Sequence, residues 1–257
     1  MPELSVAIIT KDEIERIGPC IESVRAIAAE VVVVDSGSTD GTAALCRQLG
    51  AHVLELDWAG YGRQKNRAVR AAKHDWVLSL DADERVTPQL SQAIRAAMAA
   101  PRYRAYRLRR CTRFLGRYLR HGEGYPDWSL RLFDRRCARW SDDSVHEKVL
   151  FDGPIGTLPG DLLHDTAESL EAYLAKQNRY TSLAAADAIA RGARASTARM
   201  LLSPLLRFVK FYFLRRGLLD GVPGLIHIAC GCFNSFTRYA KIREGRAHAQ
   251  NAPRLSD

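Results

Sequence analysis

The stretch Trp76-Val77-Leu78-Ser79-Leu80-Asp81-Ala82-Asp83-Glu84 joins an apolar run to a group of carboxylates. The apolar residues have the number and bulk expected of a buried strand. Asp81 and Asp83 lie two positions apart, so an extended chain directs both side chains to the same side. Two carboxylates at a strand end suit one hard cation that also bridges a diphosphate.

A second strand end of the same kind lies upstream. Val31 to Val34 are followed by Asp35 and then by the turn-forming residues 36–42, Ser-Gly-Ser-Thr-Asp-Gly-Thr. Strand and helix patterns alternate across the first hundred residues, which predicts a parallel sheet with helices on its faces. Such sheets bind ligands at the carboxyl ends of their strands. Asp35 and Asp81 both occupy such ends, so the sequence predicts a nucleotide site there.

The pattern changes after about residue 100. Residues 103–133 alternate basic and apolar side chains and predict antiparallel strands joined by a loop at 122–126, and residues 129–152 are expected to complete that sheet. From residue 169 onward the composition is helical. We therefore expect two domains, a catalytic domain at 1–165 and a basic, amphipathic helical region at 166–257.

The positive charge is concentrated in two places. The chain carries a net charge of +9, and residues 191–246 hold eleven Lys or Arg against Asp220 and Glu244, while residues 101–120 hold eight Arg and no acid. In the last third these cations alternate with Leu, Phe and Tyr, a composition typical of an interfacial helix on an anionic membrane. A core helix with a basic outer face and a dimer contact are the alternatives.

Membrane-spanning and disulfide-rich classes are not indicated. The longest apolar candidate, residues 218–236, is interrupted by Asp220, Pro223, His227 and Asn234, and no stretch reaches the length of a spanning helix. The six cysteines show no zinc spacing. With no signal peptide evident before the first strand, reduced cysteines in a cytoplasmic protein are expected.

Several motifs in order resemble those of a known enzyme family. Asp35 with residues 36–42, then Gln64-Lys65-Asn66, then residues 81–84 resemble family 2 glycosyltransferases of the GT-A fold. Residues 128–133, Val145-His146-Glu147 and the Arg-rich aromatic tail resemble the subgroup that adds β-linked glucose to heptose of the lipopolysaccharide inner core. The resemblance implies an α/β, Rossmann-like mixed sheet with helices on both faces, followed by a C-terminal helical membrane-associating region.

The resemblance also implies a donor site for a UDP-sugar. Thr10, Asp12 or Glu13 on the first loop would contact the nucleoside, and Asp35 would hold uracil or ribose. For Asp12 and Glu13, helix capping or an interaction with the helix dipole is the alternative. Asp40 is expected mainly to cap its helix.

Three further residues are expected to contact the nucleotide. Lys65 would meet phosphate as a point charge, with a solvated helix face as its alternative. Asn66 would face the nucleotide or fix the preceding loop. Arg131 is a candidate partner for donor or acceptor phosphates, although the chain offers many other basic residues.

The expected metal site centres on Asp83. By resemblance, Asp83 binds Mg²⁺ or Mn²⁺, and Asp81 lies nearer the ribose or a metal-bound water. The metal would stabilise charge on the nucleoside diphosphate leaving group. His164 is a candidate further ligand of the metal or diphosphate, and its alternative is a structural histidine.

An inverting transferase needs one general base for the acceptor hydroxyl. The candidates are Glu147, Asp127 and Asp134, and Glu147 is preferred because the family carries an acidic residue at about this distance beyond Asp-x-Asp. His146-Glu147 stands where the family commonly has Glu-Asp, so the choice among the three stays open.

The expected protein is thus a metal-dependent inverting transferase that moves a hexose, glucose by resemblance, to a lipid-linked saccharide. Its expected partners are a UDP-sugar, a lipid-linked glycan and an anionic membrane surface at the inner face of the cytoplasmic membrane. Other acceptors are alternatives: a prenyl-phosphate, a capsule glycan or a protein. A non-catalytic nucleotide-binding or nucleic-acid-binding module is the alternative of another class, but no nucleic acid is expected, because the chain lacks an aromatic stacking platform.

Overall fold

The computed structural model describes residues 2–143, 147–166 and 169–251, with side chains described as far as Arg246. The chain divides into two compact units. Residues 1–112 and 126–165 form the first unit, and residues 113–125 and 166–257 form the second. The division predicted from the sequence instead places residues 113–125 with the first part.

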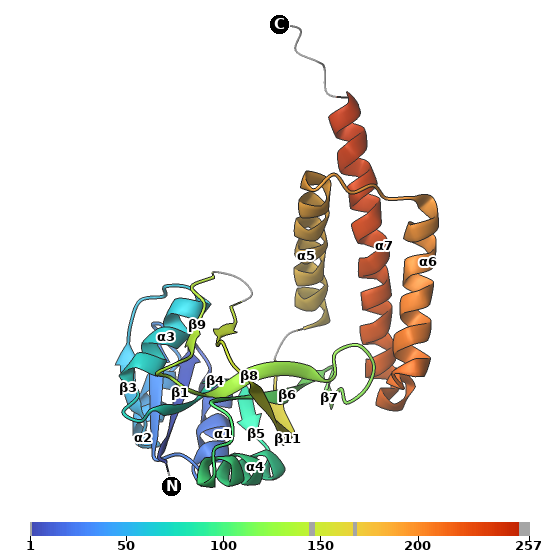
Figure 1. The fold of residues 1–257 in the computed structure, drawn as a ribbon. Helices are drawn as coiled ribbons and strands as arrows, with labels where there is room; N and C mark the ends of the chain where they lie inside the picture. Colours follow the sequence, from blue (N-terminus) through green and yellow to red (C-terminus); the bar gives the residue numbers. More distant parts are fainter. Residues whose placement is uncertain (1, 144–146, 167–168, 252–257) are drawn as a thin grey trace, which may run out of the picture. The chain divides into compact units, whose positions relative to one another are not determined.

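The first unit is built on a mixed sheet (Figure 1). Its strand order is β3-β2-β1-β4-β8-β6-β11-β5. The first four of these run parallel, β8 is antiparallel to both of its neighbours, and β11 is parallel to β6 but antiparallel to β5. The strands span Leu4–Thr10 (β1), Glu30–Asp35 (β2), His52–Glu55 (β3), Trp76–Asp81 (β4), Glu84–Val86 (β5), Ala105–Phe114 (β6), Asp127–Asp134 (β8) and Ile155–His164 (β11).

Helices cover both faces of this sheet, as alternation along β1 requires. Val6 and Ile8 pack in a core with α1 (Ile14–Val24), α2 (Thr42–Gln48) and α4 (Pro88–Ala99). Ala7 and Ile9 point to the opposite face and pack in a second core with α3 (Tyr61–Ala71). A strand buried on both faces reads as a continuous apolar run, which explains the sequences of β1, β2 and β4. The predicted mixed α/β sheet with helices on both faces is confirmed.

Strand register places three polar residues at one edge of the sheet. Thr10 pairs with Asp35, and Ile9 pairs with Asp81, so the carboxyl ends of β1, β2 and β4 lie together. Asp134 pairs with Trp76 at the other end of β4. The predicted clustering of acidic strand ends is confirmed for Asp35 and Asp81.

The region beyond β8 differs from the prediction. Residues 129–152 were expected to complete the antiparallel sheet, and residues 129–134 do so as part of β8, but β9 (Arg139–Trp140) and β10 (Val149–Leu150) pair only with each other in a separate two-stranded sheet. The strand that completes the main sheet is β11, ten residues long and later in the chain. The antiparallel pairing of β6 with β8 agrees with the prediction.

The second unit is mainly helical. It contains α5 (Leu170–Ala190), α6 (Thr197–Phe208), a π-helical turn η1 (Val209–Leu214), a 3-10 turn η2 (Gly217–Asp220) and α7 (Gly221–Asn251). Its β7 (Arg117–Tyr118) pairs with the end of β6. α7 packs against both α5 and α6. Within the described part of the chain, no helix has both the length and the apolar character needed to cross a bilayer.

Candidate functional site

A cavity of about 560 Å³ opens where β1 and β4 end. The two strands are neighbours and run parallel, so the chain leaves both of them at the same end of the sheet, where sheets of this kind bind their ligands. The cavity is lined by Ile9, Thr10, Lys11, Glu13, Trp58, Tyr61, Asp81, Ala82, Asp83 and His164.

Asp83 and His164 meet in this cavity. The Oδ2 atom of Asp83 lies 3.2 Å from Nε2 of His164, and Nδ1 of His164 lies 3.2 Å from the hydroxyl of Thr112. The pairing of β5 with β11 sets His164 opposite Glu84, and the amide of Asp165 donates to the carbonyl of Asp83. Residues eighty positions apart are therefore held side by side.

The ligand atoms of this pair are of types that bind divalent cations. A carboxylate oxygen and an imidazole nitrogen are ordinary ligands of Mn²⁺ and related ions. No group of three or more His, Cys, Asp or Glu side chains suited to a metal occurs among the described residues. Mg²⁺ in phosphate-transfer sites is commonly held by one or two carboxylates plus substrate phosphates and water, and Asp83 can supply such a carboxylate.

Thr10 contributes an unsatisfied group at the same place. Its side chain is buried, and its Oγ1 has no hydrogen-bond partner among the described residues. Buried hydroxyls in folded proteins are nearly always paired. An unpaired hydroxyl on the wall of a cavity therefore indicates that a ligand or water completes it.

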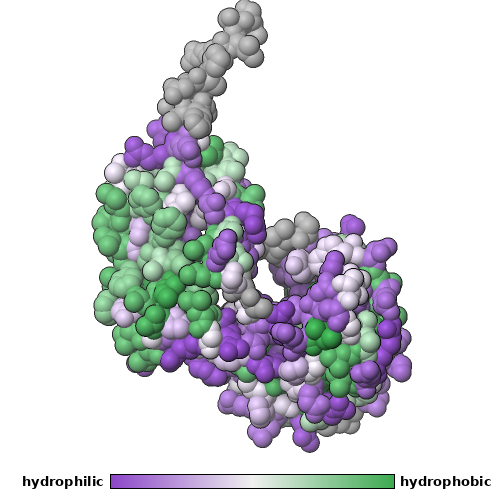
Figure 2. Space-filling model, turned by 180° about the vertical axis from the view of Figure 1, so that it is seen from behind, coloured by the Kyte–Doolittle hydropathy of each residue, from purple (hydrophilic) through white to green (hydrophobic). Residues whose placement is uncertain are grey.

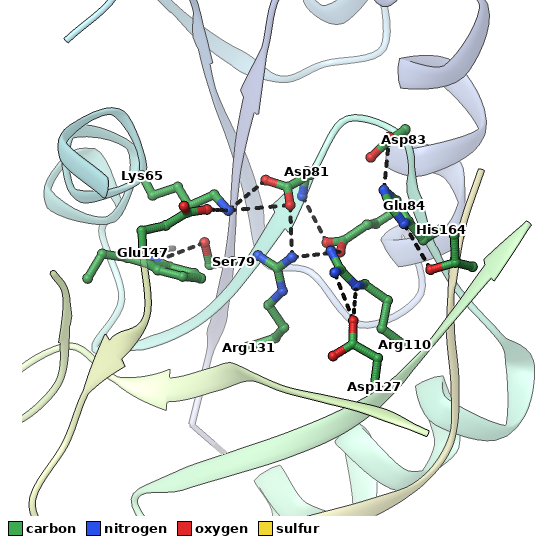
Figure 3. A network of polar contacts seen from close by, with 12 residues as sticks. Lys65, Ser79, Asp81, Asp83, Glu84, Arg110, Asp127, Arg131, Glu147 and His164 are labelled. Atoms are coloured by element: carbon green, nitrogen blue, oxygen red, sulfur yellow. Dashed lines mark hydrogen bonds and ion pairs between the residues drawn. The ribbon is translucent and has the colours of Figure 1, made fainter. Parts of the chain in front are cut away.

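The Asp81 carboxylate is held by two buried cations (Figure 3). Lys65 Nζ lies 3.0 Å from its Oδ1, and Arg131 Nη2 donates to its Oδ2 at 2.8 Å. Burial raises the pKa of Asp81, but the charges of Arg131 and Lys65 lower it more, so the net pKa lies well below its usual range. Asp81 is consequently a fixed anion at the cavity wall.

Glu84 is a member of this network that the sequence did not identify as functional. It is fully buried, accepts from Arg131 Nη2 at 2.6 Å with Oε1, and accepts from the amide of Asp81 at 3.0 Å with Oε2. Burial lowers the pKa of Arg131, but Glu84 and Asp81 raise it more, which keeps the guanidinium charged. The only sign of this role of Glu84 in the sequence is its position directly after Asp81-Ala82-Asp83.

Lys65 joins Asp81 to the preferred general base. Its Nζ lies 2.9 Å from Oε1 of Glu147 and 4.5 Å from the centre of the Trp140 ring. Lys65 is buried and is not among the residues that line the cavity. The predicted contact of Lys65 with phosphate stays a prediction, as does the role of Glu147. Val145 and His146, which were part of that motif, lie outside the described residues.

The first loop is tied to the turn after β2. Asp12 has a left-handed backbone (φ 51°), and its Oδ1 accepts from the amide of Thr39 at 2.8 Å. The amide of Glu13 donates to Thr42 Oγ1. Glu13 also lines the cavity, where burial raises its pKa in spite of an opposing contribution from Arg16.

Asp35 and Asn66 make structural hydrogen bonds. Buried Asp35 accepts from the amides of Gly37 and Ser38 at 3.0 and 2.8 Å and so shapes the turn that follows β2. Asn66 accepts from the amide of Trp140 and donates to its carbonyl, at 3.0 and 2.9 Å, and so anchors β9 to α3. Their predicted contacts with the nucleotide are not tested by this geometry and stay predictions.

The two other candidate bases lie in different surroundings. Asp127 pairs with Arg110 at 2.8 Å, and Arg110 lies 3.6 Å from Glu84, so Asp127 borders the network at its far side (Figure 3). Asp134 lies at the other end of β4 from Asp81 and is held at 2.7 Å by both Arg104 and Arg136. Distance therefore disfavours Asp134 as a base.

The cavity also has an aromatic wall that was not predicted. The rings of Trp58 and Tyr61 meet edge to face with centroids 4.8 Å apart, and both residues are exposed. The sequence indicated only a Gly-containing loop here. The available signal was two aromatic residues close together in that loop.

Comparison with known proteins gives consistent matches. A family model described as Glycosyl transferase family 2 matches residues 5–150. An uncharacterized glycosyltransferase of Rickettsia typhi is 32% identical over 263 residues, covering 98% of this chain and 90% of the relative. The lipopolysaccharide core biosynthesis glycosyltransferase LpsC of Rhizobium meliloti is 32% identical over 253 residues, covering 95% of this chain and 93% of LpsC.

A weaker match was found among solved structures. Glucosyl-3-phosphoglycerate synthase from Mycobacterium tuberculosis, in complex with Mn²⁺ and uridine-diphosphate-glucose, is 22% identical and covers 44% of each chain at a TM-score of 0.37.

Proposed function

Since the chain belongs to glycosyl transferase family 2, we propose that it is a metal-dependent inverting enzyme that moves a hexose from a UDP-sugar to a lipid-linked saccharide. Glucose is the proposed sugar, and heptose of the lipopolysaccharide core is the proposed acceptor. The near full-length similarity to LpsC supports this acceptor class. The observation that carries the proposal is the cavity in which Asp83 and His164 lie 3.2 Å apart beside the unpaired hydroxyl of Thr10.

In the proposed donor complex, Asp83 and His164 would hold Mg²⁺ or Mn²⁺. The ion supplies positive charge that stabilises the departing nucleoside diphosphate. Thr10 donates a hydrogen bond from its hydroxyl to an oxygen of the sugar nucleotide, and Asp81 accepts a hydrogen bond from a ribose hydroxyl. Trp58 and Tyr61 provide an aromatic wall against which a planar base or the apolar face of a sugar can pack.

In the proposed reaction, the acceptor hydroxyl attacks the anomeric carbon as the bond to the diphosphate breaks on the opposite face. Glu147 takes the hydroxyl proton. Lys65 is the proposed positioning residue, because its ammonium contacts Glu147 and Asp81 at 2.9 and 3.0 Å. Its burial favours this role over direct contact with phosphate.

The proposed location is the inner face of the cytoplasmic membrane, with the protein bound peripherally. A lipid-linked acceptor requires the cavity to work close to a bilayer. The eleven basic residues between 191 and 246 support attraction to anionic lipid.

The test is transfer of labelled hexose from a panel of UDP-sugars to detergent-solubilised lipopolysaccharide core acceptors. We expect transfer with a β-linked product, and a loss of at least a hundredfold in Asp83→Asn with unchanged folding. Asp152→Asn is the matched control, because Asp152 is an exposed carboxylate of the same unit outside the cavity. An α-linked product from an α-linked donor would overturn the inverting mechanism, and full activity of Asp83→Asn would overturn the proposed site.

A further inference from the structure

The leucines of helix α6 face solvent, whereas a surface helix of a soluble protein normally buries its leucines. One stripe, which includes Ser203, Arg207 and Phe208, is partly buried, and Ser203 lies 2.6 Å from Ser235 of α7, so this stripe faces the helical core. The opposite stripe contains Leu201, Leu202, Leu205 and Leu206, and its last two members are 63% and 68% exposed. A surface helix normally directs its apolar stripe inward. Here the outward stripe is the more apolar one.

The apolar surface continues beyond α6. The π-helical turn η1 contacts both α6 and η2, and η2 leads directly into α7. Leu214, at the end of η1, is 75% exposed. We call this surface the outer apolar face, and it comprises Leu201, Leu202, Leu205, Leu206, Val209, Phe213, Leu214, Leu218, Leu219 and Val222, all exposed. Figure 2 shows hydrophobic side chains gathered over these helices.

The backbone changes direction within this surface. Pro204 lies within α6, and the following residues widen into the π-helical turn, which rotates the residues after it. Arg216 then adopts a left-handed conformation (φ 56°) and ends the helix. Phe208 stacks on Tyr212 at 4.9 Å, which supports the wide turn from within.

The charge that accompanies the outer apolar face has a single sign. Arg199, Lys210, Arg215 and Arg216 are exposed among its apolar residues. Asp220 is the only acidic residue between 188 and 243, and it is buried, where it accepts from the amides of Arg120 and His121. The face therefore presents apolar and basic side chains without an exposed acid.

We propose that the outer apolar face is a docking surface for an anionic lipid bilayer, with its Leu and Phe side chains entering the acyl boundary and its basic side chains meeting head groups. The inference deepens the proposed function, on which it rests for the choice of a lipid-linked acceptor. Contiguous exposed apolar patches of this kind are rare on monomeric soluble proteins. Helix α6 has twelve residues, too few to span a bilayer, so it would lie in the plane of the interface.

A second copy of the chain fits this face less well. In a two-fold symmetric dimer the same patch meets itself, so basic side chains of one copy would approach basic side chains of the other. No exposed carboxylate of the face is present to compensate them. An anionic head-group layer compensates all four cations and also accepts the leucines.

The test is flotation of the full chain with vesicles, without donor or acceptor. We expect binding to vesicles of phosphatidylcholine with phosphatidylglycerol, and binding at least tenfold weaker to phosphatidylcholine alone. Leu205→Gln/Leu206→Gln should weaken binding to the anionic vesicles at least tenfold. Leu183→Gln is the matched control, since Leu183 is 65% exposed on α5 and lies outside the face, and it should change binding less than twofold.

Two results would overturn the inference. One is unchanged vesicle binding of Leu205→Gln/Leu206→Gln, which would show that the leucines do not enter the bilayer and that charge alone attracts the protein to it. The other is no binding to anionic vesicles together with a concentration-dependent dimer in sedimentation, which would assign the face to a second copy. Because these variants replace exposed residues, they should keep the helix signal in circular dichroism. Failure here leaves transfer to a detergent-solubilised acceptor intact, so it is distinguishable from failure of the proposed function.

Discussion

Replacing Arg131 with Met should strongly destabilise the first unit. Arg131 Nη2 donates to Asp81 at 2.8 Å and to Glu84 at 2.6 Å, and Arg131 and Glu84 are both buried. Asp81 keeps Lys65 at 3.0 Å after the change, whereas the next cation to Glu84 is Arg110 at 3.6 Å. Glu84 therefore bears most of the loss.

The expected loss follows from this geometry. Removing one partner of a buried ion pair costs about 3–5 kcal/mol, because the other charge stays buried without compensation. Met has a similar length and relieves the desolvation of the guanidinium, and Arg110 compensates part of the charge, so we expect about 3 kcal/mol. The free energy of unfolding from urea titration, followed by Trp fluorescence, measures this loss.

Two variants make the measurement decisive. Arg25→Met removes an exposed ion pair with Glu22 in the same unit and should cost less than about 1 kcal/mol. Arg131→Met/Glu84→Gln removes both charges and should recover more than about 1 kcal/mol of the single-variant loss. If Arg131→Met costs no more than Arg25→Met, the buried network does not stabilise the first unit.

Three other predictions concern separate features. Thr10→Val should leave the free energy of unfolding unchanged or raise it, because Oγ1 has no partner among the described residues. The same variant should weaken UDP binding about tenfold in calorimetry. Unchanged UDP affinity would contradict a contact between Thr10 and the ligand. Gly62→Ala should lower the free energy of unfolding in urea by about 1–3 kcal/mol, because a Cβ there would lie 1.9 Å from the Ser141 carbonyl oxygen. Gly18→Ala is the control and should be neutral or stabilising, because the nearest contact of its Cβ would be at 3.9 Å. Equal effects of the two changes would argue against the close approach at Gly62. Burial, and then the charge of Arg207, lowers the pKa of His227, so the stability that neutral His227 contributes is present above pH ~6.5 and is lost as pH falls through the lower pKa of the folded state. His227→Gln should remove this part of the pH dependence of the unfolding of the helical unit. An unchanged pH profile of unfolding would contradict this role of His227.

Local pattern was sufficient to predict the end of the sheet at which the candidate site lies. The apolar runs ending in Asp35 and Asp81 predicted buried parallel strands, and parallel strands must end at the same edge. The order of motifs further predicted the family. These inferences depend on periodicity and chain direction, which are properties of short segments.

Contacts between distant segments were harder to predict. Lys65 looked like a solvated or phosphate-binding residue of a helix, but its partner Glu147 lies 82 positions away, and nothing local to Lys65 indicates burial. Glu84 was read only as part of an acidic motif, because its partner Arg131 comes from β8. His164 and Asp83 were each proposed for the metal site, yet their 3.2 Å approach depends on the pairing of β5 with β11.

Two segments of the chain were assigned differently for a similar reason. Residues 139–150 have enough β-branched and aromatic character to join the main sheet, but Asn66 holds the backbone of Trp140 against α3. Residues 113–125 follow directly on β6 and read as part of the sheet, but the amides of Arg120 and His121 bind Asp220 of the helical unit. Composition does not reveal such side-chain anchors.

The most direct test of the central claim is calorimetric binding of UDP and UDP-glucose, with and without Mn²⁺ or Mg²⁺, to the wild-type chain, Asp83→Asn and the control Asp152→Asn. We expect metal-dependent binding to the wild type and to Asp152→Asn, and binding at least tenfold weaker to Asp83→Asn. Metal-independent binding, or binding unaffected by Asp83→Asn, would contradict the assignment of the cavity as a metal-assisted nucleotide-sugar site.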